Sequence, residues 1–232
     1  MKKDVEEKVR GELADWEYVN SLPEEWYGFT LTRYENIYDA FYEFLSYENR
    51  ERHRRLVIYF HQETMEYKLK VGYGLTEFCR IDCIAATRDE FEALLRRYLE
   101  EILRSMAAER VENIGSFVLN KHIMDYDFGD LLPEELEGFQ LFIRPSAPVP
   151  ITNFSYIIID YECFELESNV IIYYNVFRDE FFGEARICRI PTMSYQFDAN
   201  TLDGLAEKLR EHLLPRLIEI KEAALQERAK SK

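Results

Sequence analysis

The chain contains a long stretch that returns later in the same sequence. Residues 56–67 read Leu-Val-Ile-Tyr-Phe-His-Gln-Glu-Thr-Met-Glu-Tyr, and residues 170–181, which lie 114 positions further on, read Val-Ile-Ile-Tyr-Tyr-Asn-Val-Phe-Arg-Asp-Glu-Phe. The register continues without a gap from the pair Ile37/Ile151 to the pair Leu103/Leu217. A fixed internal period is typical of a duplicated structural unit. The repeat therefore constrains the architecture before any single residue is considered, although it does not define an activity.

A second shared motif precedes the repeat in each copy. Leu-Pro-Glu-Glu occupies residues 22–25 and 132–135, and Gly28 and Gly138 follow at the same distance. The offset here is 110, because the second copy adds four residues in its Pro-rich loop at 144–150. Proline presets φ for a turn, so we expect a turn or a single helical turn, with a strand opening after each glycine.

The repeat also resolves an ambiguous segment. Residues 37–48 could form a helix face, but their counterpart Tyr156–Cys163 is rich in β-branched and aromatic residues and indicates a strand. We therefore expect strands in both copies. The following segments alternate apolar and polar residues, as in a half-buried antiparallel sheet. For the last strand, the pattern predicts the following inward residues: Cys79, Ile81, Cys83 and Ala85 in the first copy, and Met193, Tyr195, Phe197 and Ala199 in the second.

Each copy is expected to close with a helix. Thr87 followed by Glu90 forms a capping box, and Thr201 with Asp203 keeps the cap and the early acidic residue. Leucine-rich stripes at helical spacing follow both caps. We also expect a short helix over 2–18, a kink at Pro215, an extra strand at 116–120 and a fraying end at 221–232.

These patterns predict an α+β fold built from an internal duplication. Each repeat is expected to be an antiparallel sheet of four or five strands backed by a C-terminal helix, and the repeats are expected to pack with pseudo-two-fold symmetry. The predicted domains are 1–110, which includes the N-terminal helix, and 111–232, which includes the polar C-terminal tail.

The net charge of the chain argues against one class of function, general nucleic-acid binding. The formal net charge is −15, and the acidity is shared: residues 1–110 carry 17 basic and 23 acidic side chains, and residues 111–232 carry 12 and 21. A chain without a cation excess is a poor generic nucleic-acid binder. The charged N-terminus lacks a secretory apolar region, and no apolar run has the length of a membrane helix, so we expect a cytoplasmic protein without a membrane contact.

Motifs for common chemistries are missing from the sequence. There is no Gly-rich phosphate loop and no Gly-x-Ser-x-Gly elbow. Cys79 and Cys83 share the apolar parity of a strand and are expected to be buried, reduced core residues rather than half of a zinc site. The pair Asp160 and Glu162 is expected to be ordinary, with Tyr161 in the core and Glu162 facing solvent. We expect no catalytic residue, no metal and no cofactor.

The turn before the repeated strand provides one candidate binding site. It carries Arg50, Arg52, Arg54 and Arg55, whereas the equivalent turn carries Glu165 and Glu167. The sign reversal has two explanations. One is drift on solvated turns. The other is recognition, in which the basic turn docks on an acidic partner or on the acidic turn of a second copy.

The repeated strand itself provides another candidate. Tyr59 and His61 share one face of a strand, and Tyr173 and Asn175 occupy the equivalent positions. A Tyr/His pair could act as acid and base; a surface histidine is the simpler interpretation. The preferred function is a non-enzymatic cytoplasmic protein that binds another macromolecule, first of all a protein, in an adaptor, inhibitor or immunity-type role. The alternative is a small-molecule-binding protein or enzyme with its site in the groove between the repeats.

Overall fold

The computed structural model describes residues 1–109 and 114–230. The chain divides into two compact units, Met1–Ala108 and Glu109–Lys232. Each unit combines an antiparallel sheet with helices, so the expectation of an α+β fold is confirmed. The predicted boundary between residues 110 and 111 lies outside the described residues. The predicted pseudo-two-fold packing of the units stays a prediction.

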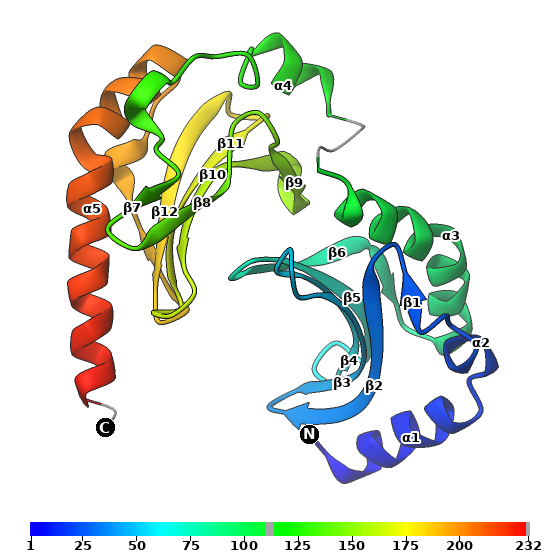
Figure 1. Cartoon of the computed structure of the whole chain (residues 1–232). Coiled ribbons are helices and arrows are strands. Elements are labelled where there is room, and N and C mark those ends of the chain that lie inside the picture. Colours follow the sequence, from blue (N-terminus) through cyan, green and yellow to red (C-terminus); the bar gives the residue numbers. More distant parts are fainter. Residues whose placement is uncertain (110–113, 231–232) are drawn as a thin grey trace. The chain divides into compact units, whose positions relative to one another are not determined.

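The first unit is a six-stranded meander with helices on one face (Figure 1). Its strands follow one another in the order β1-β2-β3-β4-β5-β6, and every pair is antiparallel. The elements are α1 (Lys3–Ala14), α2 (Glu17–Asn20), β1 (Glu25–Trp26), β2 (Phe29–Tyr38), β3 (Phe41–Asn49), β4 (Arg54–His61), β5 (Glu66–Tyr73), β6 (Thr76–Ala85) and α3 (Arg88–Ala107).

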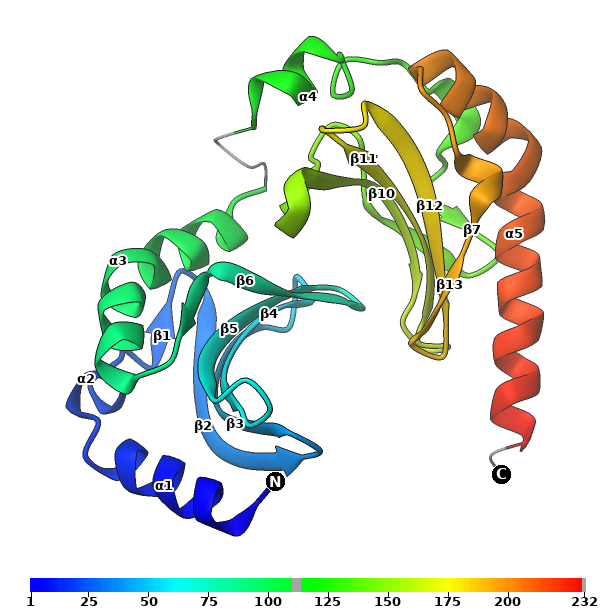
Figure 2. The ribbon, with the colours of Figure 1, turned by 180° about the vertical axis from the view of Figure 1, so that it is seen from behind.

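The second unit has a seven-stranded sheet and one long helix, which Figure 2 shows from behind. The order is β13-β12-β11-β10-β8-β7, and β9 pairs with β10. The elements are α4 (Ser116–Asn120), η1 (Gly129–Leu131), β7 (Glu135–Leu136), β8 (Phe139–Ile143), β9 (Val149–Ile151), η2 (Thr152–Phe154), β10 (Ser155–Cys163), β11 (Ser168–Asn175), β12 (Glu180–Ile187), β13 (Ile190–Met193), η3 (Tyr195–Phe197) and α5 (Leu202–Lys230).

Both sheets are larger than predicted, for two reasons. Leu-Pro-Glu-Glu is a bend that leads into a two-residue strand, β1 or β7, rather than a helical turn. That strand forms a hairpin whose turn residues all have positive φ, namely Tyr27 and Gly28, or Glu137 and Gly138. Such a turn matches the twist of the strands it joins. In the second unit the Pro-rich loop also divides one long strand into β8 and β9.

The repeated stretch forms the strands β4 and β11, as expected, and the structure places both inside their sheets. Residues 56–60 and 168–174 are buried, because these strands have neighbours on both edges and side chains on both faces. Residues 37–38 end β2, residues 39–40 form a turn, and residues 41–48 belong to β3, so the prediction of strand rather than helix is confirmed, with a turn inside the range. Both copies carry a register shift at the same place, between Glu43 and Leu45 in β3 and between Ile157 and Ile159 in β10.

The helices cap as predicted and cover one face of each sheet. The amide of Glu90 donates to the Thr87 hydroxyl at 3.3 Å, and the amide of Gly204 donates to the Thr201 hydroxyl at 3.0 Å. Leu95 and Leu209, which lie on α3 and α5, are 1% and 2% exposed. In the first unit Trp16 and Phe91 close the same core around Tyr67.

The last strand departs from the predicted alternation. In β6 the register shifts between the pairs Lys70/Cys79 and Lys68/Ile84, so that Arg80–Cys83 lie opposite a single residue of β5. Ile81 is 67% exposed instead of inward, Cys83 is buried and Cys79 is half-buried. In the second unit the same interruption becomes η3. Met193 and Tyr195 are exposed, and Phe197 is the buried residue.

Two further expectations are wrong. Residues 116–120 form the helix α4 rather than a strand. The C-terminal segment does not fray at 221, because α5 continues to Lys230 and Ala224 is fully buried. Pro215 lies inside α5, and the kink predicted there stays a prediction. Residues 231 and 232 lie outside the described part of the chain.

Candidate functional site

The basic turn of the first unit holds the C-terminal end of a helix. The Arg52 guanidinium donates to the Ala107 carbonyl at 2.5 Å, and Arg54 donates to the carbonyls of Met106 and Ala108. These carbonyls lack partners within α3, and the helix dipole makes that end negative. The positive charge of the turn therefore complements the negative C-terminal end of α3.

The equivalent acidic turn contacts a helix that continues past that position. Arg228 of α5 donates to the Glu165 carbonyl, and Arg189 pairs with Glu167 at 2.7 Å. Here the cations come from the helix and from the adjacent hairpin, and the turn supplies the acceptors. The basic turn therefore contacts a helix end through its arginine side chains, whereas the acidic turn receives Arg228 at a backbone carbonyl and Arg189 at the Glu167 carboxylate.

The other two arginines of the turn lie in different surroundings. Arg50 is almost fully exposed and pairs with Glu48 at 3.2 Å. Arg55 points to the helix-free face of the sheet, where its guanidinium donates to the Tyr34 hydroxyl at 2.9 Å and lies 3.8 Å from Glu43. The four predicted binding residues therefore do not form one surface.

A buried carboxylate organises that helix-free face. Glu43 on β3 is 3% exposed. It accepts hydrogen bonds from the Tyr38 hydroxyl at 2.8 Å and from the Asn36 amide at 3.2 Å, and Lys70 Nζ lies 2.8 Å from it. Lys70 also pairs with Glu77 at 2.9 Å. The Glu43 cluster is defined as Tyr34, Asn36, Tyr38, Glu43, Arg55, Lys70 and Glu77.

The electrostatics of the cluster favour a fixed ion network. Burial alone would raise the pKa of Glu43, but the bonds from Lys70 and Tyr38 outweigh it and the net shift is downward. Burial and the bond to Glu43 raise the pKa of Tyr38 to about 12. Tyr59 lies beside the cluster, with Lys70 5.8 Å from its ring, and burial raises its pKa as well. Tyr59 is thus a neutral side chain beside the Glu43 cluster, and the charged groups of that cluster pair with one another.

The second sheet carries a different polar group on its helix-free face. Asp160 and Glu162 are both fully buried on β10, so the expectation that Glu162 faces solvent is wrong. Asn169 on β11 donates to Asp160 at 3.1 Å. Burial, and then the neighbouring Glu162, raise the pKa of Asp160 well above its ordinary value. Tyr173 lies on the same face, stacked on Phe182 at 4.9 Å, and its pKa is raised by burial.

His61 and Asn175 lie at the ends of their strands and contact residues of the adjacent turns. The His61 ring nitrogen lies 3.0 Å from the Thr64 hydroxyl, and the ring contacts Phe41 at 4.8 Å. The Asn175 side chain donates to Ser155 at 3.0 Å and accepts from the amide of Arg178 at 2.9 Å. Within each unit these residues stabilise turns, and neither lies in an assembled acid–base pair with a tyrosine.

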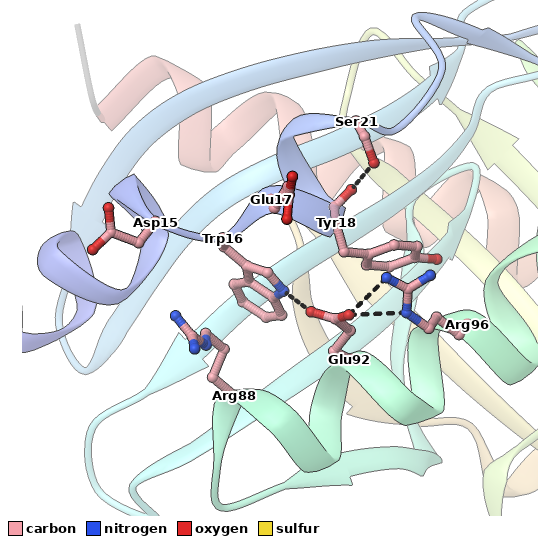
Figure 3. A pocket seen from close by; sticks show the side chains of 8 residues that line it. All are labelled: Asp15, Trp16, Glu17, Tyr18, Ser21, Arg88, Glu92 and Arg96. Atoms are coloured by element: carbon pink, nitrogen blue, oxygen red, sulfur yellow. Dashed lines mark hydrogen bonds and ion pairs between the residues drawn. The ribbon is translucent and has the colours of Figure 1, made fainter.

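Figure 3 shows a pocket of about 420 Å³ where α2 meets α3. Glu92 is its central acceptor, bound by the Trp16 indole at 2.7 Å and by Arg96 at 2.8 Å. The Arg96 guanidinium lies 4.1 Å above the Tyr18 ring. Its polar groups hold the short helix α2 on α3, and none of the sequence-predicted residues lines it.

The structure also exposes apolar side chains that sequence reasoning missed. Of the described residues, fourteen large hydrophobic side chains are exposed, and ten belong to the second unit. These ten are Phe117, Leu119, Phe154, Phe177, Ile190, Met193, Tyr195, Leu214, Ile218 and Leu225. A signal existed for several of them, because Phe154, Phe177 and Leu214 stand where the first copy has Ala40, Glu63 and Glu100.

Comparisons with known proteins add no relative. Protein-family models, curated proteins and solved structures give no significant match to this chain. Among residues 1–109 and 114–230, no group of three or more His, Cys, Asp or Glu side chains could hold a metal ion. In the same part of the chain no helix is long and apolar enough to cross a membrane.

Proposed function

We propose that this chain is a non-enzymatic cytoplasmic protein that binds another protein, in an adaptor, inhibitor or immunity-type role. The supporting observation is the concentration of exposed apolar side chains on the second unit. Isolated exposed side chains are common on any surface, but their uneven distribution between two similar units favours an interaction surface on one of them.

The polar clusters support binding rather than catalysis. Glu43 already accepts hydrogen bonds or ion pairs from residues on β2 and β5, and Asp160 is fully buried. Self-association through the basic turn is a weaker candidate, because Arg52 and Arg54 donate to carbonyls of the same unit. The small-molecule alternative with Tyr59, His61, Tyr173 and Asn175 stays a hypothesis without an observation in its favour.

We also propose that the two units arose by internal duplication. Several matched details support this proposal beyond the sequence register. Tyr47 donates to the Pro23 carbonyl at 2.7 Å, and Tyr161 donates to the Pro133 carbonyl at 2.6 Å. The pairs Val71/Phe78 and Ala185/Thr192 occupy equivalent register positions of the last strands. After a duplication, one copy can acquire a binding surface while both copies keep the common fold.

Affinity capture from native cytosol tests the proposed function. One variant combines Ile190→Ser, Met193→Ser and Tyr195→Ser in the second unit, and a matched control combines Met65→Ser and Ile81→Ser in the first. We expect wild type and control to retain the same protein, and the second-unit variant to lose it. Equal capture by all three chains, or no specific protein with wild type, would contradict the proposal.

A further inference from the structure

The most informative exposed feature is an aromatic pair at one end of the second sheet. Phe154 ends η2, and Phe177 lies in the turn between β11 and β12. Their ring centroids are 4.6 Å apart with the planes at 64°, and the side chains are 63% and 74% exposed. Phe154 and Phe177 are called the Phe pair below.

The fold of this sheet end does not require the Phe pair. In the second unit the amide of Val176 donates to the Phe154 carbonyl at 3.0 Å, and in the first the amide of Gln62 donates to the Ala40 carbonyl at 2.8 Å. The same backbone closure thus forms with alanine and Glu63 in place of the two phenylalanines. The aromatic side chains are additions to a framework that closes without them.

The backbone that presents Phe154 is strained. Asn153 and Phe154 both have positive φ, 70° and 54°, whereas in the first copy Asp39 has a positive φ of 45° and Ala40 has none. A left-handed backbone is unfavourable for residues other than glycine, and least so for Asn. Strain of this kind persists where other contacts or a ligand favour the conformation. Here the unusual conformation directs an aromatic ring outward against a second ring.

Charges beside the Phe pair are already matched within the unit. Arg178 pairs with Glu180 at 3.1 Å, and Asp179 accepts from Lys121 at 2.5 Å and from the Tyr174 hydroxyl at 2.8 Å. The centre of this surface is therefore apolar, with a polar rim. Buried aromatic anchors with a polar rim are typical of the energetic centre of protein interfaces.

The net negative charge of the second unit favours a basic protein over an anionic membrane as the partner. Residues 111–232 carry 12 basic and 21 acidic side chains, so this unit is repelled by anionic lipid surfaces, which attract Lys and Arg. The same field attracts a basic protein surface and speeds its association. On the basis of the function proposed above, we propose that the Phe pair is the anchor for a protein partner that presents an apolar pocket bordered by basic side chains.

Site-specific photocrosslinking tests this proposal with the full chain. The photoreactive residue p-benzoylphenylalanine replaces Phe177, and in a control chain it replaces Glu63, the equivalent position of the first unit. In native cytosol we expect a discrete crosslinked protein from position 177 and not from position 63. The crosslinked yield should fall as salt rises, because screening weakens attraction to a basic rim.

Competition makes the assignment quantitative. Wild type and Met65→Ser should suppress the crosslink at equal concentrations, and the double variant Phe154→Ser/Phe177→Ser should require at least about 30-fold more. Urea unfolding of the double variant should match wild type, so that a loss of competition is not a loss of folding. Equal competition by the double variant overturns the proposal.

Other occupants give other results. A crosslink to a second copy or to the first unit of the same chain, or no crosslinked species, also overturns it. Sedimentation with phosphatidylcholine/phosphatidylserine vesicles that depends on the Phe pair would assign the pair to a membrane instead. If the chain captures a partner that the double variant holds equally well, the proposed function stands and the Phe pair is not its anchor.

Discussion

Asp160 is the residue whose burial has the clearest consequence for stability. Its folded-state pKa is raised by burial and by Glu162. A carboxyl with a raised folded pKa contributes stability that is fully present below its unfolded pKa, about 3.9, and lost as pH rises through the folded value. The loss approaches about 1.4 kcal/mol for each pH unit in that window. Asp160→Asn removes the titration and keeps an acceptor for Asn169.

We therefore expect Asp160→Asn to gain stability relative to wild type as pH rises from about 4 to 8. Urea unfolding across this range measures the difference. Glu134→Gln is the control: Arg144 lowers the pKa of that exposed carboxyl, so its contribution is already complete above its unfolded pKa and the difference from wild type should stay nearly constant over this range. If the difference in unfolding free energy between wild type and Asp160→Asn does not change with pH, Asp160 titrates normally.

The prediction of solvent exposure failed for the carboxylates of β10, which lie on a polar face of the strand that is buried. Asp160 and Glu162 alternate within an apolar strand, and this pattern predicts solvent exposure because carboxylates are usually exposed. The spacing did place both on one face. Asp160 accepts a hydrogen bond from Asn169 on the neighbouring strand β11, and the local pattern does not specify such a partner.

At the scale of elements, Arg52 and Arg54 connect their own turn to the C-terminal end of α3 through hydrogen bonds to its carbonyls. Hydrogen bonds to charged groups contribute about 1.5–3 kcal/mol when partly buried. Arg54→Ser should therefore lower the free energy of unfolding by more than about 1 kcal/mol, whereas Arg50→Ser should change it by less than about 0.5 kcal/mol. Chemical denaturation measures both. Equal, small effects would mean that the turn does not hold the helix end.

The two long helices should depend on their buried leucines. Leu95→Ala and Leu209→Ala should each reduce the free energy of unfolding by about 2–5 kcal/mol, the range for truncating a core leucine. Leu225→Ala, at a position of α5 that is 52% exposed, is the matched control and should have little effect. A loss below about 1 kcal/mol at Leu95 or Leu209 would mean that the helix does not cover its sheet.

For the whole molecule, each unit has a buried core of its own and should fold by itself. Segments 1–108 and 109–232, expressed separately, should each unfold cooperatively in circular dichroism. In the full chain, Leu95→Ala should increase amide hydrogen exchange in the first unit alone, and Leu209→Ala in the second alone. Exchange that rises in both units with either variant would show that they fold as one.

The sequence by itself determined the α+β class, the strands of the repeated stretch, the helix caps and the helix-covered cores, because these follow from local periodicity and capping chemistry. The internal register also resolved residues 37–48 as strand. Only the tertiary structure decided the register shift at Ile81, the capping role of the arginines, the burial of Asp160 and the ring contact of the Phe pair. These depend on where one element ends against another, and the spacing of residues along a single element carries no record of that contact.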